Sequence, residues 1–153
     1  MRIVIAAVGK FRREPERDLY DTYIKRLSWP VALKEVEERD PLPAPQRKAS
    51  EGRKLLAALP EGATLIALDE GGKSLTSTAF SKRIGDWRDD GVAELAFVIG
   101  GADGLDAAVL ARAQLTLSLG ALTWPHMMVR AMLAEQLYRA STILAGHPYH
   151  RES

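Results

Sequence analysis

The chain has 153 residues, of which 46% are hydrophobic and 27% are charged, and its formal net charge is +1. These values predict one globular domain, residues 1–153, with a sizeable core. The absence of cysteine excludes a disulfide framework and thiolate chemistry, and it is typical of a reducing cytosol. The first apolar run is too short for a signal peptide and no stretch approaches a membrane span, so we expect a soluble, cytoplasmic protein.

The basic residues are concentrated in the first third of the chain. Thirteen of the 21 Lys and Arg residues, but only nine of the 20 acidic residues, lie at or before Lys54, which gives this part a net charge of +4. Clusters of basic residues can contact phosphates, and here they are Lys10/Arg12/Arg13, Lys25/Arg26, Arg47/Lys48 and Arg53/Lys54. Acidic residues are interspersed among them, so composition alone favours an ordinary solvated surface of mixed charge.

The first half of the chain predicts two strands and two helices. In chain order they are a strand at 3–8, a helix at 15–27, a weakly alternating strand at 31–36 and a helix at 47–59. Gly9 ends the first strand, and Pro30 ends the first helix because the residue before a proline avoids helical geometry. Three prolines within five residues predict a loop at 40–45.

The second half continues the alternation. It predicts, in order, a strand at 64–68, a helix from Thr76 or Ser77 to about Trp87, a strand at 95–99, a short helix to about Ala111, a strand at 115–119 and a long helix from Pro125 to about Leu144. Thr76 or Ser77 caps the third helix, and Asp103 with Asp106 resembles a capping box for the fourth. Apolar strands that alternate with helices predict an α/β fold, with a mostly parallel sheet covered by helices on both faces.

Two glycine-containing segments resemble nucleotide-binding motifs but fail the tests for them. The Gly-Lys-Ser at 72–74 lacks the P-loop glycine five residues earlier, where Ala67 stands inside a predicted strand. The Gly-Gly-x-x-Gly at 100–104 has the wrong spacing for a dinucleotide fingerprint, and Asp103 suits a pyrophosphate poorly. We interpret the first segment as a tight turn. The second is either a tight turn or a close approach to a ligand without phosphate.

Three connectors follow the carboxyl ends of predicted strands, at 68–74, 100–104 and 119–125. In open α/β sheets, ligands bind at this edge. The third connector carries no charge, although connectors are normally polar because they face water. Its Leu119, Leu122 and Trp124 would form the wall of a pocket for a flat aromatic group such as adenine. The alternative, equally compatible with the sequence, is that these residues plug the core beneath the last helix.

The last predicted helix is apolar over most of its circumference. One stripe contains Val129, Met132, Leu133, Leu137, Ala140 and Leu144, and a second contains Met128, Ala131, Ala134 and Tyr138. A helix of this kind is buried on two sides, so we expect one side to face the sheet and the other to form a homodimer interface. A single broad core face is the alternative.

All three histidines lie in the last quarter of the chain, at positions 126, 147 and 150. His-x-x-His without cysteine or a suitably spaced carboxylate is a poor zinc site, so we expect no metal. The tail combines the phenol of Tyr149, the imidazole of His150 and the guanidinium of Arg151, which can stack on a base, move a proton and hold a phosphate. The alternative is a disordered C-terminus.

Three motifs in order along the chain resemble those of a known family. They are Val98-Ile99-Gly100-Gly101-x-x-Gly104-Leu105, Leu119-Gly-Ala-Leu-Thr-Trp-Pro-His126, and Glu135-Gln-Leu-Tyr-Arg139 followed by His147-Pro-Tyr-His150-Arg151. Ala7-Val8-Gly9-Lys10 and the Leu68-Asp69-x-x-Gly-Lys segment also match in place. Together they resemble the ribosomal RNA large subunit methyltransferase H family, a branch of the SPOUT methyltransferases, over essentially the whole chain. Trp124, where relatives often carry Phe or Leu, is a mild variation.

The resemblance implies a parallel-sheet SPOUT fold with a C-terminal trefoil knot, a homodimer, and S-adenosylmethionine bound in the knot. By position, the cofactor-binding residues would be Leu68, Gly100, Leu119, Gly120, Ala121, Leu122, Thr123 and Trp124. The implied reaction is methylation of N3 of a pseudouridine in helix 69 of 23S rRNA, on the assembled ribosome. His126, Tyr149 and His150 are the candidates for removing the N3 proton, and Arg151 would hold a phosphate or a uracil oxygen. The sequence does not choose between the three.

Two other classes of function remain open at this point. One is a non-catalytic ribosome-binding protein that has kept the fold. The other is an enzyme acting on a small nucleotide, which is disfavoured because no phosphate-binding loop passed inspection.

Overall fold

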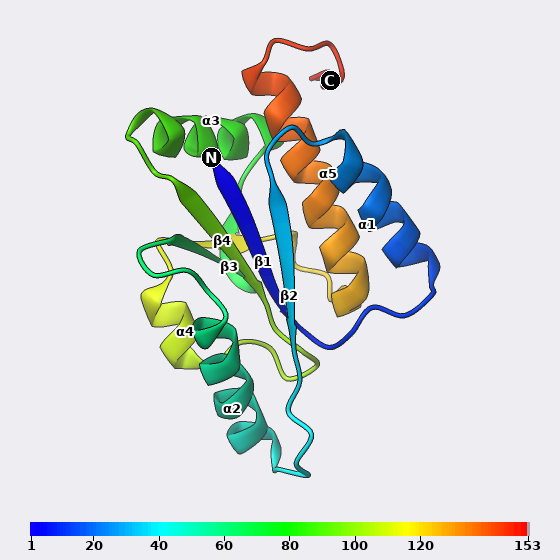
Figure 1. The fold of residues 1–153 in the computed structure, drawn as a ribbon, viewed down its shortest axis with the longest axis vertical. Coiled ribbons are helices and arrows are strands. Elements are labelled where there is room, and N and C mark those ends of the chain that lie inside the picture. Colours follow the sequence, from blue (N-terminus) through cyan, green and yellow to red (C-terminus); the bar gives the residue numbers. More distant parts are fainter. Residues whose placement is uncertain (153) are drawn as a thin grey trace.

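Five parallel strands form one sheet, in the order β2-β1-β4-β3-β5, in the computed structural model, which describes residues 1–152 (Figure 1). The strands are β1 (Arg2–Val8), β2 (Val31–Val36), β3 (Thr64–Ser74), β4 (Glu94–Ile99) and β5 (Leu115–Ser118). The helices are α1 (Pro15–Arg26), α2 (Ala44–Ala57), α3 (Ser77–Asp89), α4 (Ala107–Arg112) and α5 (His126–Leu144). The predicted α/β fold with a parallel sheet is confirmed.

Helices cover both faces of this sheet, as predicted. On one face, α1, α3 and α5 pack against alternate strand residues such as Ile5 and Phe97. On the other face, α2 and α4 pack against the intervening residues, such as Ala6 and Val98. This alternation is what a sheet buried on both faces requires, because successive side chains of a strand point to opposite sides. None of the helices in the described part of the chain has the length and apolarity needed to cross a membrane.

Helix α5 runs antiparallel to the strands, so its amino end lies near the carboxyl ends of the strands and its carboxyl end lies near their amino ends (Figure 1). Its first residue, His126, lies beside the carboxyl end of β1, where a Cβ built on Gly9 would be 3.7 Å from His126 Nε2. At the other end, Leu144 packs against Gly85 of α3. The C-terminal tail therefore leaves α5 near the amino ends of the strands, far from His126.

Two local predictions were wrong in detail. Helix α2 begins at Ala44 rather than at Arg47, because Pro45 occupies its first turn, where a missing N–H costs nothing. Asp106 alone caps α4 by accepting from the Ala108 amide, whereas Asp103 instead forms an ion pair with Arg47 at 2.7 Å. The predicted cap of α3 is confirmed at Thr76, whose side chain accepts from the Ala79 amide.

Strand β3 also extends beyond its predicted end at Leu68. Residues 69–72 bulge out, and the strand rejoins β5 at Lys73 and Ser74. Gly72 allows the close approach, because a Cβ on it would lie 2.6 Å from the carbonyl carbon and oxygen of Thr116. The segment predicted as a tight turn is therefore a bulge at whose end two backbone segments lie in contact.

Candidate functional site

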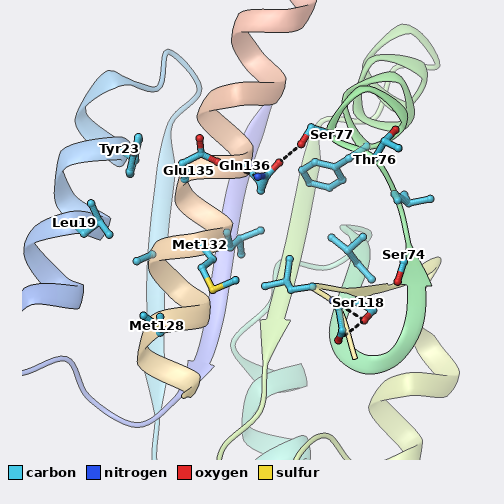
Figure 2. Close-up of a pocket in the computed structure, with 17 residues that line it drawn as sticks. Leu19, Tyr23, Ser74, Thr76, Ser77, Ser118, Met128, Met132, Glu135 and Gln136 are labelled. Atoms are coloured by element: carbon cyan, nitrogen blue, oxygen red, sulfur yellow. Dashed lines mark hydrogen bonds between the residues drawn. The ribbon is translucent and has the colours of Figure 1, made fainter. Parts of the chain in front are cut away.

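A groove of about 560 Å³ lies over α5, between α1 on one side and the start of α3 on the other (Figure 2). Most of its lining is apolar, and hydroxyl groups of Ser74, Thr76, Ser77 and Ser118 lie along the α3 side. Met128 and Met132 of α5 form its centre, and Leu19 and Tyr23 of α1 form the other side. This volume is in the range of small-molecule sites, about 300–1,000 Å³.

Two of the predicted cofactor residues, Leu119 and Gly120, line this groove at the end of β5. The Ser118 hydroxyl closes a tight turn here, because it accepts from the Gly120 amide at 3.1 Å and donates to the Gly120 carbonyl at 3.0 Å. Gly120 has a φ of +111°, in the left-handed region that favours glycine. The turn directs the chain away from β5 and into the connector that leads to α5.

The rest of this connector, with the predicted residues Ala121, Leu122, Thr123 and Trp124, is exposed. Leu122 is 72% exposed, and Trp124 is 38% exposed while its indole N–H donates to the Leu119 carbonyl at 3.3 Å. These side chains do not plug the core, so that alternative is wrong for Leu122 and Trp124, whereas the partly buried Leu119 does pack against the core. The apolar connector is instead available to a ligand or a partner.

Leu68 and Gly100, the two other predicted cofactor residues, are buried and do not line the groove. Leu68 lies within β3, just before its bulge, and Gly100 directly follows β4. Leu68 pairs with Ile99 and Leu117 in the sheet. Gly100 has no space beside it, because a Cβ there would lie 2.7 Å from the carbonyl carbon and oxygen of Gly104. The glycines of 100–104 thus serve a tight turn, which favours the first of the two interpretations given for them.

His126 is half-buried at the first position of α5. Its ring takes part in no hydrogen bond or ion pair with any other residue between 1 and 152, whereas the rings of the other two histidines both do. The imidazole nitrogens of His126 therefore remain free to interact with a bound molecule.

Tyr149 and His150 fold back onto the carboxyl half of α5. The Tyr149 hydroxyl donates to Glu135 Oε1 at 3.0 Å, and its ring centre lies 4.8 Å from both the Tyr138 ring centre and the Arg139 guanidinium carbon. Arg139 donates to His150 Nδ1 at 3.0 Å and binds Glu135 in an ion pair of 2.5 Å. The tail up to this point is ordered against the helix, so the disordered alternative is wrong.

These contacts define which tail groups donate and which accept. Burial raises the pKa of Tyr149 to about 12, and hydrogen bonds with Tyr23 and Glu135 act in the same direction. The Tyr149 hydroxyl is therefore a donor at neutral pH. Arginine can only donate, so His150 Nδ1 is an acceptor, and the neutral ring carries its proton on Nε2. Arg151 is exposed beyond them.

The predicted catalytic residues thus fall into two groups within one chain. Arg139, against which His150 packs, lies more than three turns of α5 from His126, or about 20 Å along the helix axis. The fold brings Tyr149 and His150 together and leaves His126 at the other end of α5, beside the carboxyl end of β1. Among residues 1–152, no cluster of three or more histidine or acidic side chains is arranged to hold a metal ion.

Sequence reasoning missed Arg130, the largest of the completely buried side chains. One of its terminal nitrogens donates to the Glu35 carboxylate at 2.6 Å. The other donates to the carbonyls of Val8 at 3.1 Å and Gly9 at 2.9 Å. The sequence does contain one indication of its role. Arg130 lies inside a helix predicted to be buried on two sides, and a buried arginine almost always has specific partners.

Comparison with known sequences relates nearly the whole chain to one family. The sequence model described as "Predicted SPOUT methyltransferase" matches residues 1–150. A protein of Paramagnetospirillum magneticum named ribosomal RNA large subunit methyltransferase H is 60% identical over 151 residues, which cover 99% of each chain. A protein of Rhodospirillum rubrum with the same name is 51% identical, with the same coverage.

Solved structures resemble the fold. A probable methyltransferase from Bordetella pertussis superposes with a TM-score of 0.58 and 16% identity, covering 91% of this chain and 95% of that one. A probable methylase family protein from Haemophilus influenzae gives a TM-score of 0.57 and 11% identity, covering 98% of this chain and 70% of that one. At such low identities the likeness is evidence for the fold alone.

Proposed function

Because the chain belongs to the SPOUT methyltransferase family, we propose that it is an S-adenosylmethionine-dependent methyltransferase of ribosomal RNA. The observation that carries this proposal is the similarity, over 99% of the chain, to relatives named ribosomal RNA large subunit methyltransferase H. We propose N3 of a pseudouridine in helix 69 of 23S rRNA as the target, on the assembled ribosome in the cytoplasm. The motifs quoted from the sequence support this finer assignment.

SPOUT methyltransferases use S-adenosylmethionine, so the expected cofactor is confirmed. When bound, this cofactor supplies an electrophilic methyl group for in-line displacement, and catalysis then depends mainly on positioning. The chain's residues fit such a ligand. Leu122 and Trp124 would cover the adenine, and the Leu119–Gly120 turn would offer backbone groups beside the groove. Leu68, just before the bulge of β3, and Gly100, directly after β4, would shape the site without lining the groove.

We also propose the trefoil knot that the resemblance implies, with the chain after β5 threaded through the segment that begins at the bulge of β3. Gly72 lies against the backbone of Thr116, and Ser74 pairs with Ser118. The two segments therefore touch just before the chain enters the β5–α5 connector, which supports a threaded path there. An experimental chain trace through residues 68–76 and 115–126 tests this path.

Removal of the N3 proton is assigned, in this proposal, to His126. The Tyr149 hydroxyl donates to Glu135, and His150 Nδ1 already accepts from Arg139, so these two groups are engaged in holding the tail. His126 has no such engagement within residues 1–152. Tyr149, His150 and Arg151 would orient the base and its phosphate.

A homodimer through α5 would unite the two groups of catalytic residues. The helix buries Ala131, Leu133 and Leu137 against its own fold but leaves Met128 39% exposed. Leu19 of α1, which lines the same groove, is 49% exposed. Two α5 helices related by a twofold axis and packed antiparallel would bring the tail of one chain to His126 of the other. The separation of about 20 Å within one chain would then be bridged by the partner.

Incubation of the protein with ribosomes from a strain that lacks it, using labelled donor, tests the proposed function. We expect one added methyl group, located on the proposed pseudouridine by mass spectrometry of rRNA fragments. Absence of transfer, together with absence of S-adenosylmethionine binding in calorimetry, would refute the proposal. Ribosome binding without transfer, with the target still methylated in the deletion strain, would favour the non-catalytic ribosome-binding alternative.

A further inference from the structure

The loop between β1 and α1 carries three cations that the fold leaves without partners. Lys10, Arg12 and Arg13 are exposed, and no carboxylate within residues 1–152 forms an ion pair with any of them. The acidic residues that follow are Glu14, the N-cap residue of α1, and Glu16 and Asp18 in its first turn, where negative charge favours the helix N-terminus. None of these acidic residues forms an ion pair with the three cations of the loop, although Glu14 directly follows Arg13 in the sequence.

This loop is held in place from inside the protein. Arg130, completely buried, donates to the carbonyls of Val8 and Gly9, where the loop begins. Its other terminal nitrogen donates to Glu35, which also accepts from the Phe11 amide at 2.7 Å. The Phe11 ring centre lies 4.5 Å from the Arg130 guanidinium carbon. Backbone and side-chain contacts on both sides of Lys10 therefore hold the loop from Val8 to Phe11.

The same anchor sets the loop beside the candidate catalytic histidine. A Cβ on Gly9 would lie 3.1 Å from Met127 Cε and 3.7 Å from His126 Nε2. Gly9 has a φ of +100°, so the turn that starts the loop depends on glycine. Figure 1 shows the loop, in dark blue, running next to the amino end of α5. Basic side chains are thus presented next to the place where the target base would react.

We propose that residues 10–13 form an RNA-binding arm, in which Lys10, Arg12 and Arg13 contact backbone phosphates flanking the target nucleotide, and that Arg130 is its positioning residue. This inference rests on the proposed rRNA methyltransferase function and names the surface that would hold the RNA. Cations on an anchored loop lose little conformational freedom on binding, so their attraction to phosphate is retained as affinity.

The direct test replaces Lys10, Arg12 and Arg13 with glutamine. Binding to ribosomes from a strain lacking the enzyme is measured with S-adenosylhomocysteine present, between about 50 and 200 mM salt. We expect binding about 10- to 100-fold weaker at the lower salt, and a slope of log affinity against log salt reduced by about 2. Affinity for S-adenosylhomocysteine in calorimetry should not change.

The matched control removes the same charge from the other face of the sheet, by Lys48→Gln, Arg53→Gln and Arg112→Gln on α2 and α4. We expect this control to bind ribosomes within about threefold of the wild type. Equal weakening in both variants, or unchanged binding of the arm variant, would overturn the arm. If the wild-type protein itself neither binds nor methylates ribosomes, the proposed rRNA function is wrong and the proposed arm with it. If the wild-type protein is active but the arm variant binds as well as the wild type, only the arm is wrong, so the two failures are distinguishable.

The role of Arg130 has a separate readout. Arg130→Lys keeps the charge but loses the fork that reaches two carbonyls and a carboxylate, so the loop should be released. We expect a higher KM for ribosomes and an unchanged kcat at saturating ribosomes. If this variant does not fold, Glu35→Gln, which weakens the same anchor from the exposed side, replaces it. A changed kcat with an unchanged KM in the folded variant would contradict the positioning role.

Discussion

The two ends of α5 differ in whether their candidate catalytic side chains already have partners in the fold. At the amino end, the fold anchors the backbone through buried Arg130 and leaves the side chains free: His126 has no partner within residues 1–152, and Leu122 and Trp124 are exposed. At the carboxyl end, the side chains themselves are engaged, since Tyr149 and His150 are bound to Glu135 and Arg139.

This difference indicates that the amino end of α5 is the end at which a ligand binds. Unengaged imidazole and exposed apolar side chains gain contacts when a molecule binds, whereas the tail has already satisfied most of its polar groups. In the proposed dimer the free end of one chain meets the ordered tail of the other, so neither chain contains a complete site.

The largest effect is expected from His126→Ala. Loss of the group proposed to take the N3 proton should slow methyl transfer about 10²- to 10⁴-fold, while cofactor binding in calorimetry remains. The matched control is His147→Gln, whose exposed ring only accepts a local hydrogen bond from the Tyr149 amide. We expect it to retain most of the activity. Equal losses of methyl transfer in the His126→Ala and His147→Gln variants would contradict the difference drawn between the two ends of α5.

Arg130→Met tests the anchor of the amino end. The change leaves two carbonyls and a carboxylate without their donor, and we expect about 3 kcal/mol of lost stability in urea unfolding. This is at the low end for a broken buried pair, because the Glu35 side chain is 26% exposed and can turn to water. As a control, Lys82→Met breaks an exposed pair and should cost less than about 0.5 kcal/mol. A similar cost for both would mean that burial of Arg130 adds nothing.

Mixed dimers test whether the two ends meet across the interface. A His126→Ala chain and a chain lacking 149–153 are each expected to be nearly inactive alone. When they are co-expressed, random pairing makes about half of the dimers mixed, each with one of two sites intact, so about a quarter of wild-type activity should return. Activity that stays at background in purified mixed dimers would place both groups of residues in one chain.

The smallest effect is expected from Tyr149→Phe, which removes one hydrogen bond to Glu135. We expect docking of the tail to weaken by about 1 kcal/mol, or roughly fivefold, measured by hydrogen exchange of the tail amides. The raised pKa adds a pH dependence. In the wild type, the contribution of the neutral phenol is complete below pH 10.0 and is lost as the pH rises through about 12. A tail that loosens near neutral pH would contradict this.

The order of elements and the two-sided burial of the sheet were predictable from the sequence, because they follow from local patterns. Residues 95–99 are apolar without interruption, as a central parallel strand requires, and β4 lies at the centre of the sheet. The extension of β3 to Ser74 was not predictable, since Gly72 is needed there only because Thr116, far away in the sequence, lies against it.

The site shows the same division. The apolar connector before α5 stood out because it contradicts its own local expectation, and it is indeed exposed. The distance between His126 and the tail could not be predicted, because it depends on where the tail folds back along α5. Arg130 is intermediate: its position in an apolar helix predicts that it needs partners, but only the fold identifies them as Glu35 and the end of β1.

The strand order has a consequence for synthesis of the protein. Strand β4 pairs with both β1 and β3, so the nascent chain up to residue 93 has only the β1–β2 pair and an isolated β3. The apolar edges of β1 and β3 stay open until β4 leaves the exit tunnel, which makes this the interval most exposed to aggregation. A protein proposed to act on ribosomes therefore completes its own fold late in translation, when most of its chain has already been made.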